Sequence, residues 1–258
     1  MMKFEMIEHN HKQLTGTVHI PDNERDQHPT VIMFHGFGGS RLESKGLFVR
    51  MSRYFEERGI ASVRFDFSGH GESEGDFYDV TLSNEVDEAK AIVDYVKGLD
   101  FVDPDRIDLL GLSLGGVVAS IVAGEMKESI HALCMWAPAA VVLDDVNKQK
   151  QIQGRDIEEE MSHQGYFDFY SLRVGPSFVD DLKTFELFER AKQYEKRVKI
   201  IHGSDDQVVP LSYSHQYMTY YGAQGELSVL EGADHAFGTY PDRMKLYEET
   251  YEFFKQKH

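Results

Sequence analysis

Residues 106–124 combine a short apolar strand, a sharp turn and an apolar helix, and this segment constrains the fold more than any other part of the sequence. The run 107–110 predicts a buried strand, residues 111–115 form a Gly-x-Ser-x-Gly turn, and the apolar run 117–123 predicts a helix. In such a turn the serine takes a strained backbone conformation, and glycines let the strand and the helix pass closely. The motif therefore predicts a serine hydroxyl, that of Ser113, aimed out of the end of a sheet.

A second copy of the same pattern occupies residues 71–75, with Ser73 at its centre. Ser73 follows a polar loop, and Asp76, Phe77 and Tyr78 come after it where the motif requires a helix. The pattern by itself is weak, because three small residues at this spacing also arise by chance. We therefore interpret Ser73 as a loop residue and Ser113 as the candidate nucleophile.

Apolar strands and amphipathic helices alternate along most of the chain. Strands are expected at 3–20 (an edge hairpin), 31–34, 60–67, 107–110, 132–139, 197–202 and 227–230, and helices at 47–58, 82–96, 117–123, 211–221 and 241–255. This order predicts βαβ units, a mostly parallel central sheet flanked by helices, and ligands at the carboxyl ends of the strands. The fold class is therefore α/β, and 258 residues fit a single domain of this kind.

Residues 141–193 interrupt the alternation of strands and helices. A structureless loop of this length is uncommon in a compact domain, so we expect a cap subdomain inserted over the strand ends. The segment contains an aromatic cluster that either packs the cap onto the core or lines a pocket, and the sequence leaves both readings open. The cluster consists of Tyr166, Phe167, Phe169, Tyr170 and Phe178.

Composition limits the classes of partner. The formal net charge is −17, from 27 Lys and Arg against 44 Asp and Glu, and such a field repels nucleic acid and anionic membrane surfaces. No apolar run approaches the length of a membrane span, and the amino-terminal residues are polar, so a soluble cytoplasmic protein is expected. A single cysteine, Cys134, excludes an internal disulfide. The oligomeric state stays open, with a homodimer among the alternatives.

Neither a metal nor an organic cofactor is called for by the sequence. His9, His11 and His19 cluster near the amino terminus but have no carboxylate or cysteine at ligand spacing. The glycine loop at 36–39 follows a predicted strand, yet it lacks the Lys-Ser/Thr pair of a P-loop and the third glycine of a dinucleotide fingerprint. We therefore expect a small-molecule substrate and no cofactor.

A serine nucleophile needs a base and an orienting carboxylate, and later strand ends supply candidates for both. The turn after the strand at 197–202 carries Asp205 and Asp206, and the loop after the last predicted strand carries His235. The order serine, acid, histidine is that of α/β-hydrolases. We take Asp206 as the acid and His235 as the base, with Asp205, Asp144 and Asp145 as rival acids. His202 and His70 are treated as structural histidines.

Ester attack places negative charge on the carbonyl oxygen, and preorganised N–H groups stabilise that charge. One donor is expected to be the N–H of Leu114, directly after the nucleophile. The other is expected to be the N–H of Phe37, in the glycine loop after the 31–34 strand. Because both groups belong to the backbone, the side chains at 37 and 114 remain available to shape a pocket.

Over nearly its full length the chain resembles the cinnamoyl (feruloyl) esterase branch of the α/β-hydrolases of gut and lactic bacteria. The motifs that carry the resemblance are His-Gly-Phe-Gly-Gly at 35–39, residues 60–67 leading into Gly-His-Gly at 69–71, the serine turn at 111–120, Ala-Pro-Ala-Ala at 137–140, His-Gly-Ser-Asp-Asp at 202–206 and Glu-Gly-Ala-Asp-His at 231–235. The resemblance implies an α/β-hydrolase fold, Ser113, Asp206 and His235 as the catalytic triad, and residues 141–193 as the cap that covers the acyl group.

The resemblance also implies substrate contacts in the cap. In this family polar cap residues hold the phenolic hydroxyl of the acid, and the matching carboxylate falls at Asp145. Phe178 stands where relatives carry a ring-binding tyrosine, so one hydroxyl is missing here. Tyr166 and Tyr170 complete the expected set of pocket residues.

The expected reaction is hydrolysis of carboxylic esters, with hydroxycinnamic esters as the substrate class. A short-chain carboxylesterase, a monoacylglycerol lipase, a thioesterase and a peptidase use the same triad on the same fold, and fold alone does not separate them. A ligand-binding protein built on a hydrolase scaffold is the alternative without catalysis.

Overall fold

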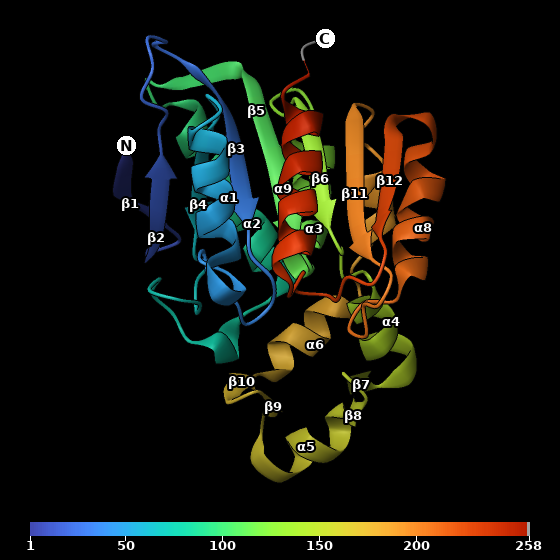
Figure 1. Cartoon of the computed structure of the whole chain (residues 1–258). Coiled ribbons are helices and arrows are strands. Elements are labelled where there is room, and N and C mark those ends of the chain that lie inside the picture. The colour runs from blue at the N-terminus through green and yellow to red at the C-terminus, as the bar shows by residue number, and fades with distance from the viewer. Residues whose placement is uncertain (257–258) are drawn as a thin grey trace.

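Eight strands form the central sheet in the order β1-β2-β4-β3-β5-β6-β11-β12 (Figure 1). The structure, a computed structural model, describes residues 1–256. The strands are Met2–His9 (β1), Lys12–His19 (β2), His28–Phe34 (β3), Ala61–Phe65 (β4), Val102–Leu112 (β5), Ala132–Trp136 (β6), Arg197–Gly203 (β11) and Gly225–Leu230 (β12). β2 runs antiparallel to β1 and β4, and the other neighbours in the sheet are parallel. The predicted α/β fold with a mostly parallel sheet is confirmed.

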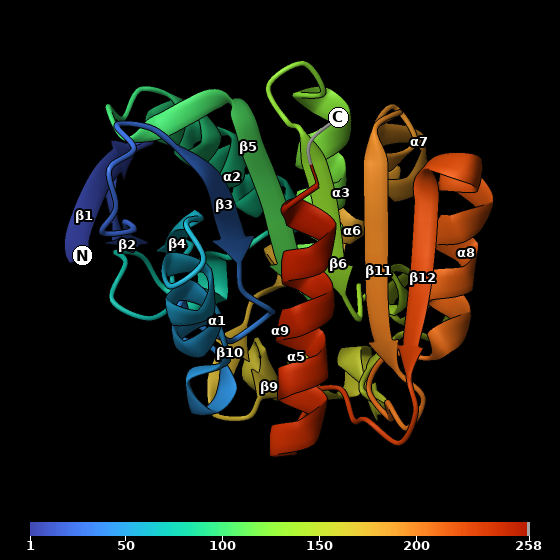
Figure 2. The same cartoon turned by 45° about the horizontal axis from the view of Figure 1, so that its top comes forward.

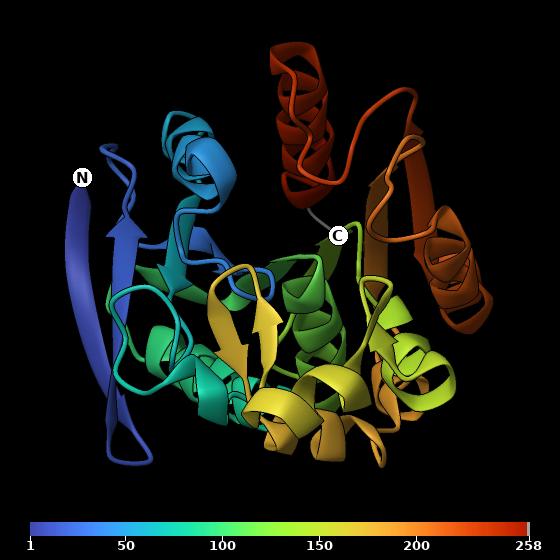
Figure 3. The same cartoon turned by 90° about the horizontal axis from the view of Figure 1, so that it is seen from below.

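Helices cover both faces of the sheet, as Figures 2 and 3 show. α1 (Leu47–Glu56) and α9 (Tyr240–Phe254) lie on one face, and α2 (Leu82–Lys97), α3 (Leu114–Glu125) and α8 (Leu211–Tyr221) lie on the other. The period-2 alternation of β3 separates the two cores, because Ile32 and Phe34 pack with α2 and α3, whereas Val31 and Met33 pack with α1. A central strand that is apolar on both faces is therefore buried on both.

Two strands differ in length from the prediction. β5 begins at Val102, five residues before the apolar run at 107. Its first residues include Asp103, Pro104 and Asp105. The polar start conceals the strand from hydrophobic periodicity, yet Val102 already pairs with His28 of β3. β6, by contrast, ends at Trp136, three residues before the expected end at 139.

Most of the segment between β6 and β11 folds into short elements beyond the carboxyl ends of the central strands (Figures 1 and 3). Its last helix, Leu187–Ala191 (α7), lies instead near the start of β11 and packs against α3 (Figure 2). The elements before α7 are α4 (Val141–Asp144), a π-helical turn (Asp145–Gln149), β7 (Gln151–Ile152), β8 (Arg155–Asp156), α5 (Ile157–Gln164), β9 (Phe167–Phe169), β10 (Leu172–Val174) and α6 (Pro176–Leu182). Single 3-10 turns occur at Ser44–Gly46, Phe77–Asp79 and Gly222–Gln224. Within residues 1–256, none of the helices has the length and apolar character needed to span a membrane.

Candidate active site

Ser113 lies in the tight turn between β5 and α3, with backbone angles φ 56° and ψ −122°. A positive φ is strained for a residue other than glycine and is typical of a nucleophile elbow. The neighbouring glycines are required by close approach: a Cβ at Gly111 would lie 2.1 Å from the carbonyl oxygen of Gly115, and one at Gly115 would lie 2.1 Å from that of Phe34. The turn thus places a partly exposed serine at the sheet edge.

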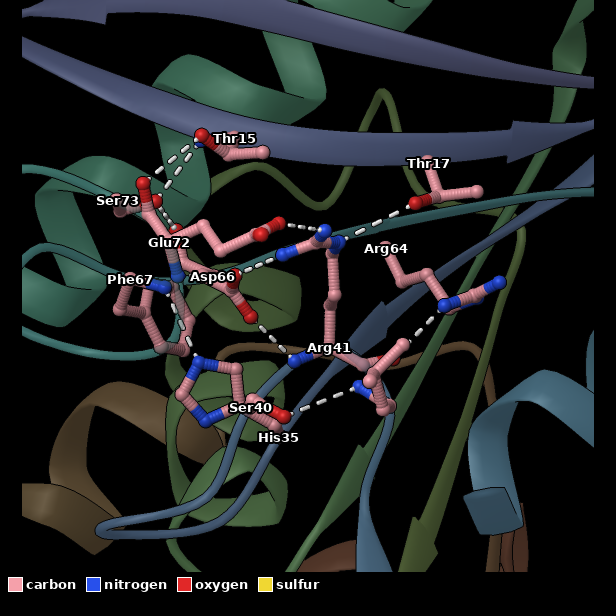
Figure 4. Close-up of polar contacts among 11 residues, drawn as sticks. Thr15, Thr17, His35, Ser40, Arg41, Arg64, Asp66, Phe67, Glu72 and Ser73 are labelled. Carbon is pink, nitrogen blue, oxygen red and sulfur yellow. Dashed lines mark hydrogen bonds and ion pairs between the residues drawn. The ribbon is translucent and has the colours of Figure 1, made fainter.

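The second copy of the motif has a structural role. The Ser73 hydroxyl donates a hydrogen bond to the carbonyl oxygen of Asp66 at 2.7 Å and accepts one from the N–H of Thr15 at 2.8 Å (Figure 4). The first bond closes the 66–75 loop on itself, and the second ties the loop to β2. Ser73 is therefore a loop residue that is already fully engaged with backbone groups.

Asp206 and His235 meet at the carboxyl ends of β11 and β12. Oδ2 of Asp206 lies 2.7 Å from Nδ1 of His235, and Oδ1 accepts the N–H groups of Val208 and Val209, both at 2.8 Å. Burial by itself raises the pKa of the Asp206 carboxyl, but the hydrogen bonds from His202 and His235 outweigh burial and hold that pKa well below its usual range. Asp206 is therefore a permanently ionised acceptor for His235.

His202 is also joined to this carboxylate, which the sequence did not indicate. Its Nε2 lies 3.0 Å from Oδ2 of Asp206, and its Nδ1 lies 2.6 Å from the hydroxyl of Ser214. The imidazole is completely buried. His202 is thus a structural histidine that orients Asp206.

The rival acids have other neighbours. Asp205 is exposed and lies beside the hydroxyl of Ser204. Asp144 accepts a hydrogen bond from the hydroxyl of Tyr213 at 3.1 Å. None of Asp205, Asp144 and Asp145 is hydrogen-bonded to His235, whereas Asp206 is.

A cavity of about 310 Å³ opens over Ser113 and His235. Its walls come from the glycine loop, the serine turn, the segment 141–193 and the 206–209 turn. The lining residues are Phe37, Ser113, Leu114, Ala139, Val141, Val142, Asp145, Ile152, Gln153, Phe169, Tyr170, Phe178, Val208, Val209 and His235. Of the residues expected to contact substrate, Asp145, Tyr170 and Phe178 line this cavity and Tyr166 does not. Ile152 and Gln153 belong to it without any sequence signal.

Aromatic rings from the segment 141–193 and from the core form one wall of the cavity. The Phe37 ring stacks on Phe178 with centroids 4.5 Å apart and meets Phe169 edge-on at 5.0 Å. Phe178 and Phe169 therefore both pack residues 141–193 against the core and line the cavity, so for these two rings the two readings hold together. Asp145 adds a carboxyl whose pKa is raised by burial and by the negative charge of Asp144.

A buried ionic network fixes the loops behind the site (Figure 4). The Arg41 guanidinium forms ion pairs with Asp66 and Glu72, and its Nε donates to the hydroxyl of Thr17 at 3.2 Å. Arg41 and Asp66 are almost completely buried, and removing one partner of such a pair strands the other charge. The network joins the loop after β3 to the loop after β4.

The known proteins that this chain resembles are α/β-hydrolases, esterases and a thioesterase. The family described as "Alpha/beta hydrolase family" matches residues 31–245. Est1E from Butyrivibrio proteoclasticus, solved with ferulic acid bound, superposes with a TM-score of 0.87 at 28% identity over 97% of this chain and 98% of that chain. The chain is also 27% identical over 72% of its length to the putative esterase/lipase 2 of Mycoplasma pneumoniae, and 28% identical over 73% to the mouse mitochondrial palmitoyl-protein thioesterase ABHD10.

These sequence matches cover only part of the curated relatives. The matched segments span 37% of an uncharacterized Escherichia coli protein, 63% of the Mycoplasma protein and 62% of the mouse protein. Among the described residues, no group of three or more His, Cys, Asp and Glu side chains is arranged to hold a metal ion.

Proposed function

This chain belongs to the alpha/beta hydrolase family, and we propose that it is a serine carboxylic-ester hydrolase that works through an acyl-enzyme. The observation that carries the proposal is that Ser113 and His235 line the same largely apolar cavity, while Asp206 is hydrogen-bonded to His235. Esterase and thioesterase relatives in the same family support a hydrolase.

In the proposed reaction Ser113 attacks the ester carbonyl carbon while Nε2 of His235 takes the serine proton. The N–H groups of Phe37 and Leu114 stabilise the oxyanion, and Asp206 holds the Nδ1–H tautomer of His235. The imidazolium then gives its proton to the departing alcohol, which leaves an ester on Ser113. Water, deprotonated by His235, releases the acid and restores the hydroxyl.

For the acyl group we propose hydroxycinnamic acids such as ferulic, caffeic and coumaric acid. Three observations support this choice: the aromatic wall of Phe37, Phe169 and Phe178, the carboxyl of Asp145 on the cap side, and the likeness to Est1E with ferulic acid bound. We also propose that residues 141–193 act as the cap. A cavity of about 310 Å³ is at the small end of the range for ligand sites and suits a compact aryl acid.

A thioesterase is the second candidate, because the mouse relative bears that name and the same triad cleaves thioesters. The discriminating experiment compares kcat/KM for methyl ferulate, p-nitrophenyl butyrate and a palmitoyl thioester, with fluorophosphonate labelling of Ser113 as a measure of nucleophile activation. We expect methyl ferulate to be preferred. Preference for the long-chain thioester would replace the esterase proposal, and an unlabelled Ser113 without turnover would indicate a binding protein.

A further inference from the structure

Between Gly36 and Gly39 the loop after β3 presents four backbone N–H groups, and three of them have an acceptor. The N–H of Gly36 donates to Oε1 of Glu43 at 2.7 Å, that of Gly38 to Nε2 of His70 at 3.3 Å, and that of Gly39 to the carbonyl oxygen of Gly36 at 2.9 Å. Among the described residues the N–H of Phe37 has no acceptor, and Phe37 lines the cavity over Ser113. The unpaired donor is the one that the proposed oxyanion hole needs.

Glu43 holds one side of this loop. Its backbone has φ 56°, a strained value for a glutamate, and its Oε2 also accepts the N–H of Ser44 at 3.2 Å. The carboxylate is close to the reaction centre: a Cβ added at Gly36 would lie 3.2 Å from Cβ of Ser113 and 3.6 Å from Oε1 of Glu43. A desolvated acid in a strained backbone beside the nucleophile is a typical functional arrangement.

His70 holds the other side. Its Nδ1–H donates to the carbonyl oxygen of Ser68 at 3.1 Å, which leaves Nε2 as the acceptor for Gly38. Burial and the nearby His35 lower the pKa of His70 to about 3, so the ring is neutral and keeps this acceptor at physiological pH. The ring also packs against His35 and Phe77, with centroids 4.8 and 4.9 Å away.

We propose that Glu43 and His70 are positioning residues that hold the 36–39 loop from opposite sides, so that the Phe37 N–H alone points toward the developing oxyanion. The proposal rests on the proposed function, since it assigns this N–H to the transition state of acyl transfer. Neither side chain contacts the substrate in this arrangement. Each accepts a hydrogen bond from a backbone N–H of the loop and so restrains the loop in this conformation.

The test uses pairs of variants that separate the acceptor from the shape of the side chain. Glu43→Gln keeps an acceptor oxygen for Gly36, whereas Glu43→Ala removes it. His70→Phe keeps a ring between His35 and Phe77 but removes the acceptor for Gly38. Each variant is assayed for kcat and KM on methyl ferulate and for inhibition by an aryl trifluoromethyl ketone, which binds as an oxyanion after attack by serine.

We expect Glu43→Ala and His70→Phe to lower kcat by about 10- to 100-fold, with KM within about threefold, as for loss of part of an oxyanion hole. The ketone should lose affinity by a similar factor, and Glu43→Gln should stay within about threefold of the native enzyme in both measurements. A merely structural role would lower the melting temperature without this selective loss.

The results separate the two proposals. A native enzyme that neither hydrolyses esters nor reacts with a fluorophosphonate overturns the proposed function. A native enzyme that is active, with folded Glu43→Ala and His70→Phe variants that retain native kcat and ketone affinity, overturns only the positioning role. If Glu43→Ala does not fold, His70→Phe and Glu43→Gln still decide, because the proposal requires a loss of kcat in the first and its retention in the second.

β1 is the outermost strand at one edge of the sheet. The N–H of Ile20 donates to the carbonyl oxygen of Met1 at 2.8 Å. Because hydrogen-bonded and non-hydrogen-bonded pairs alternate in an antiparallel ladder, the backbone groups of Met2, Phe4 and Met6 face the free edge. Their side chains share one face and are 51%, 69% and 68% exposed.

The charges of β1 are complementary to a second copy of the same strand. Antiparallel pairing centred on Phe4 places Met2 opposite Met6 of the second copy and Lys3 opposite Glu5. A shift of the centre to Lys3 would oppose two lysines, and a shift to Glu5 would oppose two glutamates. Of these three registers, only the one centred on Phe4 places unlike charges opposite each other.

We infer that a second copy of this chain pairs with β1 in this register and extends the sheet across a homodimer. The experiment is light scattering on size-exclusion fractions of the native chain, Lys3→Glu and the double variant Lys3→Glu/Glu5→Lys, with methyl ferulate turnover as a fold control. We expect a dimer, a monomer and a dimer in that order. A monomeric native chain at high micromolar concentration, or a Lys3→Glu variant that remains dimeric, overturns the inference.

Discussion

Oδ2 of Asp206 lies 2.7 Å from Nδ1 of His235 and 3.0 Å from Nε2 of His202, so a single carboxylate oxygen accepts hydrogen bonds from two imidazoles. The buried His202 cannot turn away, because its other nitrogen contacts the Ser214 hydroxyl. Together with the N–H groups of Val208 and Val209, these contacts fix the carboxylate plane. Because His202, at the end of β11, holds this carboxylate in place, it also fixes the orientation of His235.

Replacing Asp206 by Asn should lower kcat by about 10⁴, because an amide that donates toward Nδ1 stabilises the wrong tautomer of His235. Asp205→Asn is the matched control, since Asp205 is exposed one residue away and does not contact His235. Steady-state kinetics on methyl ferulate measure both. Equal losses in the two variants would contradict the choice of Asp206.

Replacing Ser113 by Ala should lower kcat by on the order of 10⁶, because no other group can form the acyl-enzyme. Ser73→Ala provides the control for the second motif copy. It removes two loop hydrogen bonds and should cost about 1–3 kcal/mol of stability while leaving kcat of the folded enzyme close to native. Loss of turnover in folded Ser73→Ala, with retention in Ser113→Ala, would reverse the assignment.

The sequence predicted the parts of this molecule that depend on local pattern. Ser113, Asp206 and His235 each follow an apolar strand, and parallel strands bring their carboxyl ends to one edge, so three distant residues could be placed together. β5 shows the limit of that reasoning, because Val102 belongs to the strand through its pairing with His28 of β3, and polar residues separate it from the apolar run at 107. Periodicity carries no information about such a partner.

The cavity and the glycine loop beside it were harder to predict, because their residues come from segments without periodicity. Glu43 lies in a loop of polar residues and reaches Gly36 through a strained backbone that no motif signals. Within residues 141–193, Tyr170 lines the cavity and Tyr166 does not, although the two are only four residues apart. Tyr170 lies in the turn between β9 and β10 with φ 50°, a conformation that hydrophobic pattern does not predict.

Asp145 offers a test of the acyl preference. We expect Asp145→Asn to raise KM for methyl ferulate about tenfold or more, because a hydrogen bond from the phenolic hydroxyl to a carboxylate contributes about 1.5–3 kcal/mol. Methyl cinnamate, which has no ring hydroxyl, is the matched substrate and should be hydrolysed almost equally by both proteins. Parallel changes in KM for the two esters would remove Asp145 from phenol recognition.

Gly115 tests the close passage of the strand and helix at the serine turn. A Cβ at this position would lie 2.1 Å from the carbonyl oxygen of Phe34 and 2.4 Å from that of His35. Gly115→Ala should therefore lower the free energy of unfolding by at least about 1–3 kcal/mol, measured by urea titration. Gly98→Ala is the control, because its Cβ would be 3.5 Å from the nearest atom and its backbone is right-handed, so it should be neutral or stabilising.

The free energy of unfolding should fall in acid, because His35, directly after β3, is buried. Burial lowers the pKa of His35 to about 4, whereas in the unfolded chain that pKa is about 6.5. Between these two values the unfolded state binds a proton that the folded state does not, so the free energy of unfolding falls as the pH falls from 6.5 toward 4. The slope contributed by one such group approaches about 1.4 kcal/mol per pH unit.

Urea titrations at several pH values between 4 and 6.5 measure this slope. His35→Gln should reduce it by close to the contribution of one proton, whatever its effect on absolute stability, because the variant has no imidazole to protonate in the unfolded chain. His215→Gln is the control: His215 is exposed on α8, and its removal should leave the slope almost unchanged. An unchanged slope in His35→Gln would mean that His35 takes up its proton in the folded protein, and the hydrogen bond from the Phe67 N–H to its Nε2 would then have to break.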